Sequence, residues 1–165
     1  MARKSPPSEA QQHIAHRRVA RRLALIGVYQ WLITGNSFQD IYADFQQDKE
    51  LAKDFRKSDA AFFHQLLRYS IENGPAIAAK LSPHLDRKLE QVDPIENAAL
   101  RIATCEMLNH IETPYKVVVN EAVNLTKKFG GEQAHKFVNG VLDKVAAETR
   151  QIEVAADQKK ASSSA

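Results

Sequence analysis

Four arginines lie close together near the start of the chain: Arg17, Arg18, Arg21 and Arg22. A guanidinium binds phosphate through paired hydrogen bonds and also stacks on the face of a nucleobase. The spacings 17 to 21 and 18 to 22 place these side chains in two adjacent ridges of one helix. The pattern predicts a contact surface for single-stranded nucleic acid, although a solvated helix face would give the same pattern.

Basic charge is concentrated at this end of the chain. Residues 1–22 hold six Lys or Arg and one Glu, whereas the remaining residues hold 17 basic and 19 acidic side chains. Such a distribution suits a polyanionic partner. Phe137, which follows Lys136 near the start of a predicted helix, has a ring that could stack on a base. Its helical period favours core packing over stacking, and both interpretations stay open.

Residues that could perform catalysis or bind a metal are few. The single cysteine, Cys105, lies in an apolar predicted helix, as is typical of a buried thiol, and the chain can form no internal disulfide. His13 and His16 lack a third metal ligand at a recognisable spacing. Gly130 and Gly131 lack the Lys and Ser or Thr of a phosphate loop and are expected to end a helix. The sequence therefore predicts no enzyme, cofactor or metal.

The elements that must position these residues are all expected to be helices, because no segment alternates with the period of a strand. The predicted fold is all-α, with about seven helices in two small packed bundles. The absence of a long apolar run or a secretion signal predicts a cytoplasmic protein without a membrane span. The expected parts are a disordered basic arm over 1–16, an N-terminal bundle over 17–81, a C-terminal bundle over 82–150 and a disordered tail over 151–165.

Local signals predict several helix ends. Thr113 is expected to cap a helix that ends at Gly130. Asp93 is expected to cap another, with Glu96 three residues later accepting a hydrogen bond in return. One weaker helix is expected over 37–55 and a short one over 82–90.

Four segments together resemble the NusB family of bacterial transcription antitermination factors. The Lys-Phe-Val-Asn-Gly-Val-Leu run, at its expected distance after Asn-Glu-Ala, is the most specific part of this resemblance, which spans about residues 17–146. The four segments are Arg17 to Trp31, Ala99 to Ile102, Pro114 to Ala122, and His135 to Lys144.

The resemblance implies an all-helical fold of two bundles and no catalysis. It implies binding of the single-stranded boxA element of nascent RNA, notably in ribosomal RNA transcription. The implied partners are NusE, a small-subunit ribosomal protein, and the RNA polymerase elongation complex with other Nus factors; whether the free protein forms a homodimer stays open. By position it implies RNA contacts for Arg17, Arg18, Arg21, Lys136 and Phe137, and contacts with NusE for Tyr29 and Glu96.

The chain departs from the family pattern in three places. Its arm before Arg17 is longer, and Arg22 and Gln133 stand where acidic residues can occur. Because the last two changes make the predicted RNA face more positive, we expect a higher intrinsic RNA affinity than in relatives. Glu96 cannot serve fully as both a helix cap and a partner contact, so its role stays open.

Two other functions fit parts of the sequence. One is an RNA-binding domain like that of RNA cytosine methyltransferases, which has this type of helical fold, although no Gly-rich cofactor loop or catalytic cysteine motif is present here. The other is a helical protein-binding adaptor whose arginines only increase solubility. Salt dependence separates the adaptor from an RNA-binding protein, because each phosphate contact on a single strand contributes about −0.7 to the log-log slope.

Overall fold

The computed structural model describes residues 3–163, which form nine α-helices and two short 3-10 helices. The all-α prediction is confirmed, with more helices than the seven expected. Within the described residues, no helix has the length and apolar character needed to cross a membrane. In chain order the elements are α1 (Glu9–Thr34), α2 (Phe38–Gln47), α3 (Lys49–Arg56), α4 (Ala60–Glu72), α5 (Gly74–Leu81), η1 (Ser82–His84), η2 (Leu89–Gln91), α6 (Pro94–Asn109), α7 (Tyr115–Phe129), α8 (Ala134–Thr149) and α9 (Gln151–Ser163).

Helix α1 begins at Glu9, so the expectation of a disordered arm is wrong for residues 9–16. The Ser8 hydroxyl accepts from the Gln11 amide at 3.2 Å, and the Ser8 amide donates to the Gln11 side chain at 2.9 Å. This capping box satisfies amides at the start of the helix. Every residue of the first two turns is exposed and carries no apolar period, which is why the pattern missed them.

Two other expected helices are divided. Asp48 ends α2 and caps α3, accepting from the amides of Glu50 and Leu51 at 2.9 and 3.1 Å, so residues 37–55 do not form one helix. The short helix expected over 82–90 is replaced by η1 and η2, with Leu85 in an extended conformation after η1.

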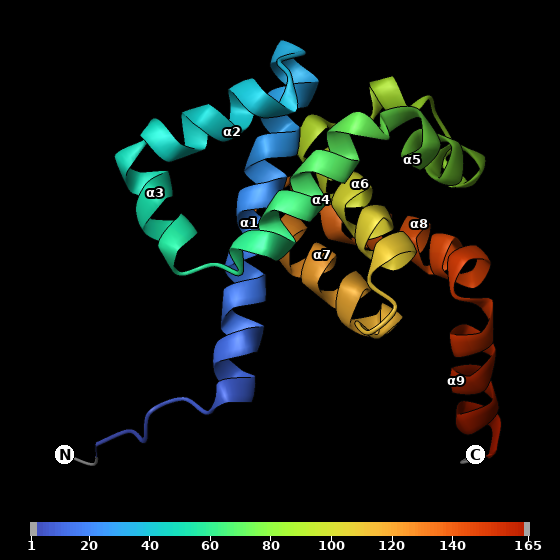
Figure 1. Ribbon diagram of the computed structural model, residues 1–165. Helices are drawn as coiled ribbons and strands as arrows, with labels where there is room; N and C mark the ends of the chain where they lie inside the picture. The colour runs from blue at the N-terminus through green and yellow to red at the C-terminus, as the bar shows by residue number, and fades with distance from the viewer. Residues whose placement is uncertain (1–2, 164–165) are drawn as a thin grey trace.

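Helix α6 lies at the centre of the molecule and packs against α1, α4, α5, α7 and α8 (Figure 1). Leu23 of α1, Leu66 of α4, Leu100 of α6 and Leu142 of α8 are fully buried in one continuous cluster. The predicted boundary between two bundles falls at the end of α5. Because one cluster of buried side chains spans both sides of it, the division into two bundles remains a prediction.

The end of the chain forms α9, so the expected disordered tail is wrong for residues 151–163. Together with the first turns of α1, α9 projects from one side of the molecule (Figure 1). Asp157 accepts from the Tyr115 hydroxyl at 3.0 Å and pairs with the Lys116 ammonium at 2.7 Å. No α9 residue is buried, so the helix carried no apolar signal. Residues 164 and 165 of the predicted tail, like residues 1 and 2 of the arm, lie outside the described residues.

The predicted Thr113 cap of α7 is wrong. Pro114 occupies the cap position and makes no side-chain capping bond. The amide of Tyr115 instead donates to the Glu153 carboxylate of α9 at 2.8 Å. A carboxylate at a helix N-terminus also interacts favourably with the positive end of the helix dipole. Helix α9 therefore supplies the cap that α7 lacks locally.

Candidate nucleic-acid interface

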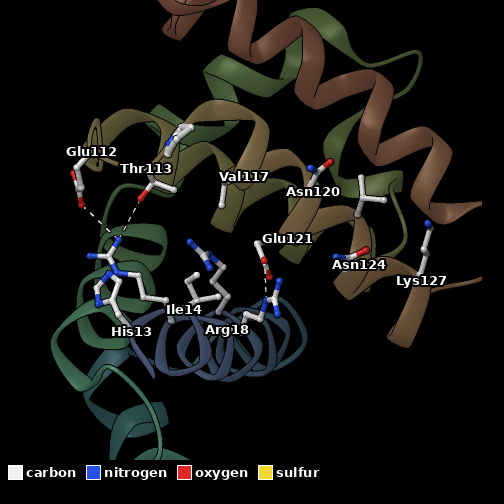
Figure 2. Close-up of a pocket in the computed structure, with 14 residues that line it drawn as sticks. His13, Ile14, Arg18, Glu112, Thr113, Val117, Asn120, Glu121, Asn124 and Lys127 are labelled. Carbon is white, nitrogen blue, oxygen red and sulfur yellow. Dashed lines mark hydrogen bonds and ion pairs between the residues drawn. The ribbon is translucent and has the colours of Figure 1, made fainter. Parts of the chain in front are cut away.

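A groove of about 730 Å³ runs between the first turns of α1 and the length of α7 (Figure 2). We call it the α1/α7 groove. The loop that joins α6 to α7 closes one end. Its lining residues are His13, Ile14, Arg17, Arg18 and Arg21 from α1, Glu112, Thr113 and Pro114 from the loop, and Val117, Asn120, Glu121, Val123, Asn124 and Lys127 from α7.

Arg18 lines this groove with 61% of its side chain exposed. Its Nε donates to Oε1 of Glu121 at 2.9 Å, across the groove (Figure 2). Ion pairs with such an exposed member contribute little to stability, so a phosphate oxygen can replace the carboxylate at small cost. The geometry leaves Arg18 accessible, and its predicted RNA contact remains a prediction.

Arg17 is held more firmly, with only 16% of its side chain exposed. Its Nη1 donates to the Thr113 hydroxyl at 3.2 Å, and its guanidinium lies 3.5 Å from Glu112 and 3.6 Å from Asp59. The guanidinium carbon also lies 4.1 Å from the centroid of the Phe62 ring. These contacts fasten α1 to α4 and to the α6–α7 loop, so Arg17 shapes the wall of the groove.

Arg21 is only 5% exposed. Its Nε and Nη2 donate to the two carboxylate oxygens of Glu106 at 2.8 and 2.6 Å. Breaking this pair would leave a buried carboxylate without a partner. Nη1 of Arg21 takes part in neither bond, and Arg21 lines the α1/α7 groove. The pair joins α1 to α6, and the RNA contact predicted for Arg21 remains a prediction.

Arg22 lies on a smaller hollow of about 380 Å³ that shares Arg18, Glu121 and Asn124 with the α1/α7 groove. Its Nη2 pairs with Asp54 of α3 at 3.1 Å. Lys128 lines the same hollow. The basic surface therefore continues from Arg18 toward the end of α7.

Lys136 and Phe137 do not line the α1/α7 groove. The Phe137 ring is partly buried against the core, and the Arg87 guanidinium carbon lies 5.0 Å from its centroid. Lys136 is exposed. The structure therefore does not bring this pair into the groove that holds Arg17 and Arg18, and their RNA contacts remain a separate prediction.

Tyr29 is exposed on α1, whereas Glu96 is partly buried at the start of α6. Asp93 caps α6 as expected, accepting from the amides of Ile95 and Glu96 at 2.9 and 3.5 Å. Among the described residues, the predicted hydrogen bond from the Asp93 amide to the Glu96 carboxylate is not formed. Burial raises the pKa of Glu96, with the negative charge of Asp93 adding and Arg87 opposing. Contacts of Tyr29 and Glu96 with a partner remain predictions.

Cys105 is buried in α6, as predicted. Burial raises the pKa of its thiol to about 12, which makes it unreactive in the folded protein. Among the described residues, no three His, Cys, Asp or Glu side chains gather as metal ligands would.

Several groove residues were missed from the sequence: Asn120, Asn124 and Lys127 on α7, and Ile14 on α1. The three α7 residues follow one another at spacings of four and three, which is the signal of one helix face. Nothing in that period says which other helix the face meets. The pairing of α7 with the exposed start of α1 came only from the structure.

Comparison with protein families finds that the NusB family model matches residues 18–147. The chain is 49% identical over 144 residues to the transcription antitermination protein NusB of Azoarcus sp. (strain BH72), covering 87% of this chain and 91% of that protein. It is 44% identical over 153 residues to the transcription antitermination protein NusB of Cupriavidus pinatubonensis, covering 93% of this chain and 86% of that protein.

Among solved structures, T. maritima NusB is similar with a TM-score of 0.67 and 27% identity, covering 80% of this chain and 91% of that one. A crystal structure of the antitermination factors NusB and NusE in complex with double-stranded RNA gives a TM-score of 0.64 at 24% identity, covering 79% of this chain and 95% of that one. At that identity the second likeness concerns the fold alone.

Proposed function

The chain belongs to the NusB family, and from this premise we propose that it is a cytoplasmic transcription antitermination factor that binds boxA-type single-stranded RNA. It does so together with the ribosomal protein NusE and acts on elongating RNA polymerase with other Nus factors, notably in ribosomal RNA transcription. Its task is binding and assembly, without catalysis. The curated relatives, which are antitermination proteins matched over most of their length, support this proposal over an RNA methyltransferase domain.

One observation carries the RNA-binding part of the proposal: Arg18 lines the α1/α7 groove and is mostly exposed. Its guanidinium already holds an oxyanion, the carboxylate of Glu121, at 2.9 Å. A phosphate offers the same charge-assisted hydrogen bonds. Exposed apolar side chains of Ile14 and Val117 lie in the same groove and suit unstacked bases, which favours a single strand over a duplex.

The proposal is tested by fluorescence anisotropy with a boxA-like single strand and a duplex of the same sequence, each with and without NusE. We expect wild-type protein to prefer the single strand. Arg18→Ala should weaken binding and reduce the magnitude of the log-log salt slope by about 0.7, the value for one phosphate contact on a single strand. Its thermal melt should be unchanged, because the removed side chain is exposed.

Arg68→Ala is the matched control. Arg68 is an exposed arginine on α4 that pairs with Glu72 at 3.0 Å and does not line the α1/α7 groove. The Arg68→Ala substitution removes the same charge elsewhere on the protein, and we expect RNA binding to stay at the wild-type level. Equal losses in the two variants would contradict a specific role for the groove. Binding of NusE without any salt-dependent RNA binding would favour the protein-binding adaptor.

A further inference from the structure

Two amide side chains are unpaired in the α1/α7 groove. Asn120 and Asn124 are four residues apart on α7 and lie on its groove side (Figure 2). Both are exposed, and neither side chain hydrogen-bonds to any residue that the structure describes. A polar helix face that meets only solvent would look similar. These two amides differ because they face a second wall, the first turns of α1.

The groove offers each part of a nucleotide a different contact. A carboxamide presents donors and an acceptor side by side, which matches the edge of a nucleobase. Ile14, 50% exposed, and Val117, 40% exposed, offer apolar surface for the base itself. Arg18 is the cation available to phosphate beside them.

We propose that Asn120 and Asn124 read base edges in the α1/α7 groove and so determine which sequence of single-stranded RNA the protein prefers. This inference rests on the proposed function, because it needs the RNA strand to enter this groove. The ligand class is an unstacked nucleobase, with adenine favoured because an asparagine can pair with its amino group and ring nitrogen together. Arg18 supplies affinity for any strand, and the two amides supply preference among strands.

The test compares two single-stranded RNAs of equal length and composition, one boxA-like and one with the same bases shuffled. The quantity measured is the ratio of their dissociation constants for wild type, Asn120→Ala, Asn124→Ala and the double variant. We expect each single substitution to reduce this preference by about ten-fold, as for loss of one base-reading amide. The salt slope should stay at the wild-type value, since no phosphate contact is removed. Alanine favours helix more than asparagine does, so α7 should remain folded in a thermal melt.

Gln46→Ala removes a similar exposed amide from α2, outside the groove, and should leave the preference unchanged. If the asparagine variants weaken both RNAs equally, or leave the ratio unchanged, the base-reading role is wrong. The proposed function still stands in that case if wild type binds RNA and Arg18→Ala weakens this binding. Failure of wild type to bind either RNA, with or without NusE, overturns both.

Discussion

Glu121 pairs with Arg18, the residue proposed above to contact an RNA phosphate. The carboxylate is mostly covered, with 13% of its side chain exposed, whereas 61% of the Arg18 side chain is exposed. A phosphate must therefore compete with it for the guanidinium. If the groove binds RNA as proposed, Glu121 lowers its affinity for the strand.

We predict that Glu121→Gln tightens RNA binding by about 0.2 to 1 kcal/mol, the range measured for exposed ion pairs. The affinity is measured by anisotropy at low salt, where the pair is least screened. Glu72→Gln removes the same charge from α4, where Glu72 pairs with the exposed Arg68 at 3.0 Å outside the groove, and is the matched control. Equal tightening in both variants would mean that net charge, and not release of Arg18, is responsible.

For Arg21 we predict an effect on the stability of the fold. Its bidentate pair with Glu106 is buried, so Arg21→Ala leaves the Glu106 carboxylate without its partner and should lower the free energy of unfolding by about 3 to 5 kcal/mol. Urea unfolding measures this loss, and Arg18→Ala should stay within about 0.5 kcal/mol of wild type. An Arg21→Ala protein of normal stability that failed to bind RNA would instead show a direct contact.

These arginines also show where prediction from sequence stops at single residues. The sequence identified Arg17, Arg18, Arg21 and Arg22 as one basic surface, and only Arg18 is mostly exposed. Glu106, which buries Arg21, and Thr113, which binds Arg17, are distant in sequence and carry no local signal of these pairings. Helical spacing reports the direction of a side chain but not its partner.

At the scale of helices, α9 stabilises α7. Glu153 accepts from the Tyr115 amide and pairs with the buried Arg150 guanidinium at 2.7 Å. Glu153→Ala removes both contacts, and we predict a loss of about 0.5 to 2 kcal/mol, the range for a lost helix cap. Thermal melts measure the effect, with Glu132→Ala as an exposed control. A Glu153→Ala melt that matches wild type would mean that water replaces this cap without loss.

The docking of α9 should also depend on pH through Asp157. Hydrogen bonds from Lys116 and Tyr115 hold the pKa of Asp157 below its ordinary value of 3.8. The folded state therefore favours the ionised form. The resulting stabilisation is complete above pH 3.8 and is lost as the pH falls through the lowered folded pKa.

Amide signals of α9 in an NMR titration into acid should report this release. Asp157→Asn should remove the dependence that belongs to this carboxylate. If the signals of α9 and of α4, which makes none of these contacts, change together in wild type, the cause is general acid unfolding.

The presence of a helix was predictable from the sequence wherever the helix buries an apolar face, as α4 and α6 do. The start of α1 and all of α9 were not, because neither buries such a face. Ser8 and Gln11 could have revealed the first, since their spacing is that of a capping box. Helix α9 is held by contacts with Tyr115 and Lys116, which are remote from it in sequence.

For the molecule as a whole, the groove depends on α6, which packs against helices of both predicted bundles. Arg21 of α1 bonds to it, α7 packs along it, and the α6–α7 loop closes the groove. The sequence predicted α6 as a core helix from its nearly continuous apolar residues. It could not predict that α1, assigned to the other bundle, would form the second wall of a groove with α7.

The two predicted bundles each contain one natural probe, which allows a test of whether they unfold together. Trp31, the only tryptophan, lies on α1, and Cys105, the only cysteine, is buried in α6. Because α6 packs against helices on both sides of the predicted boundary, we expect a single cooperative transition. Trp31 fluorescence and labelling of the Cys105 thiol should therefore give the same urea midpoint.

Leu100→Ala sharpens this prediction. Leu100 is fully buried in α6, and the cavity left behind should lower the free energy of unfolding by about 3 to 5 kcal/mol. In a cooperative molecule the Trp31 and Cys105 midpoints fall by the same amount, although only Cys105 is on the mutated helix. If the Cys105 midpoint falls while that of Trp31 stays in place, the bundles unfold independently. The α1/α7 groove would then exist only while the two are docked.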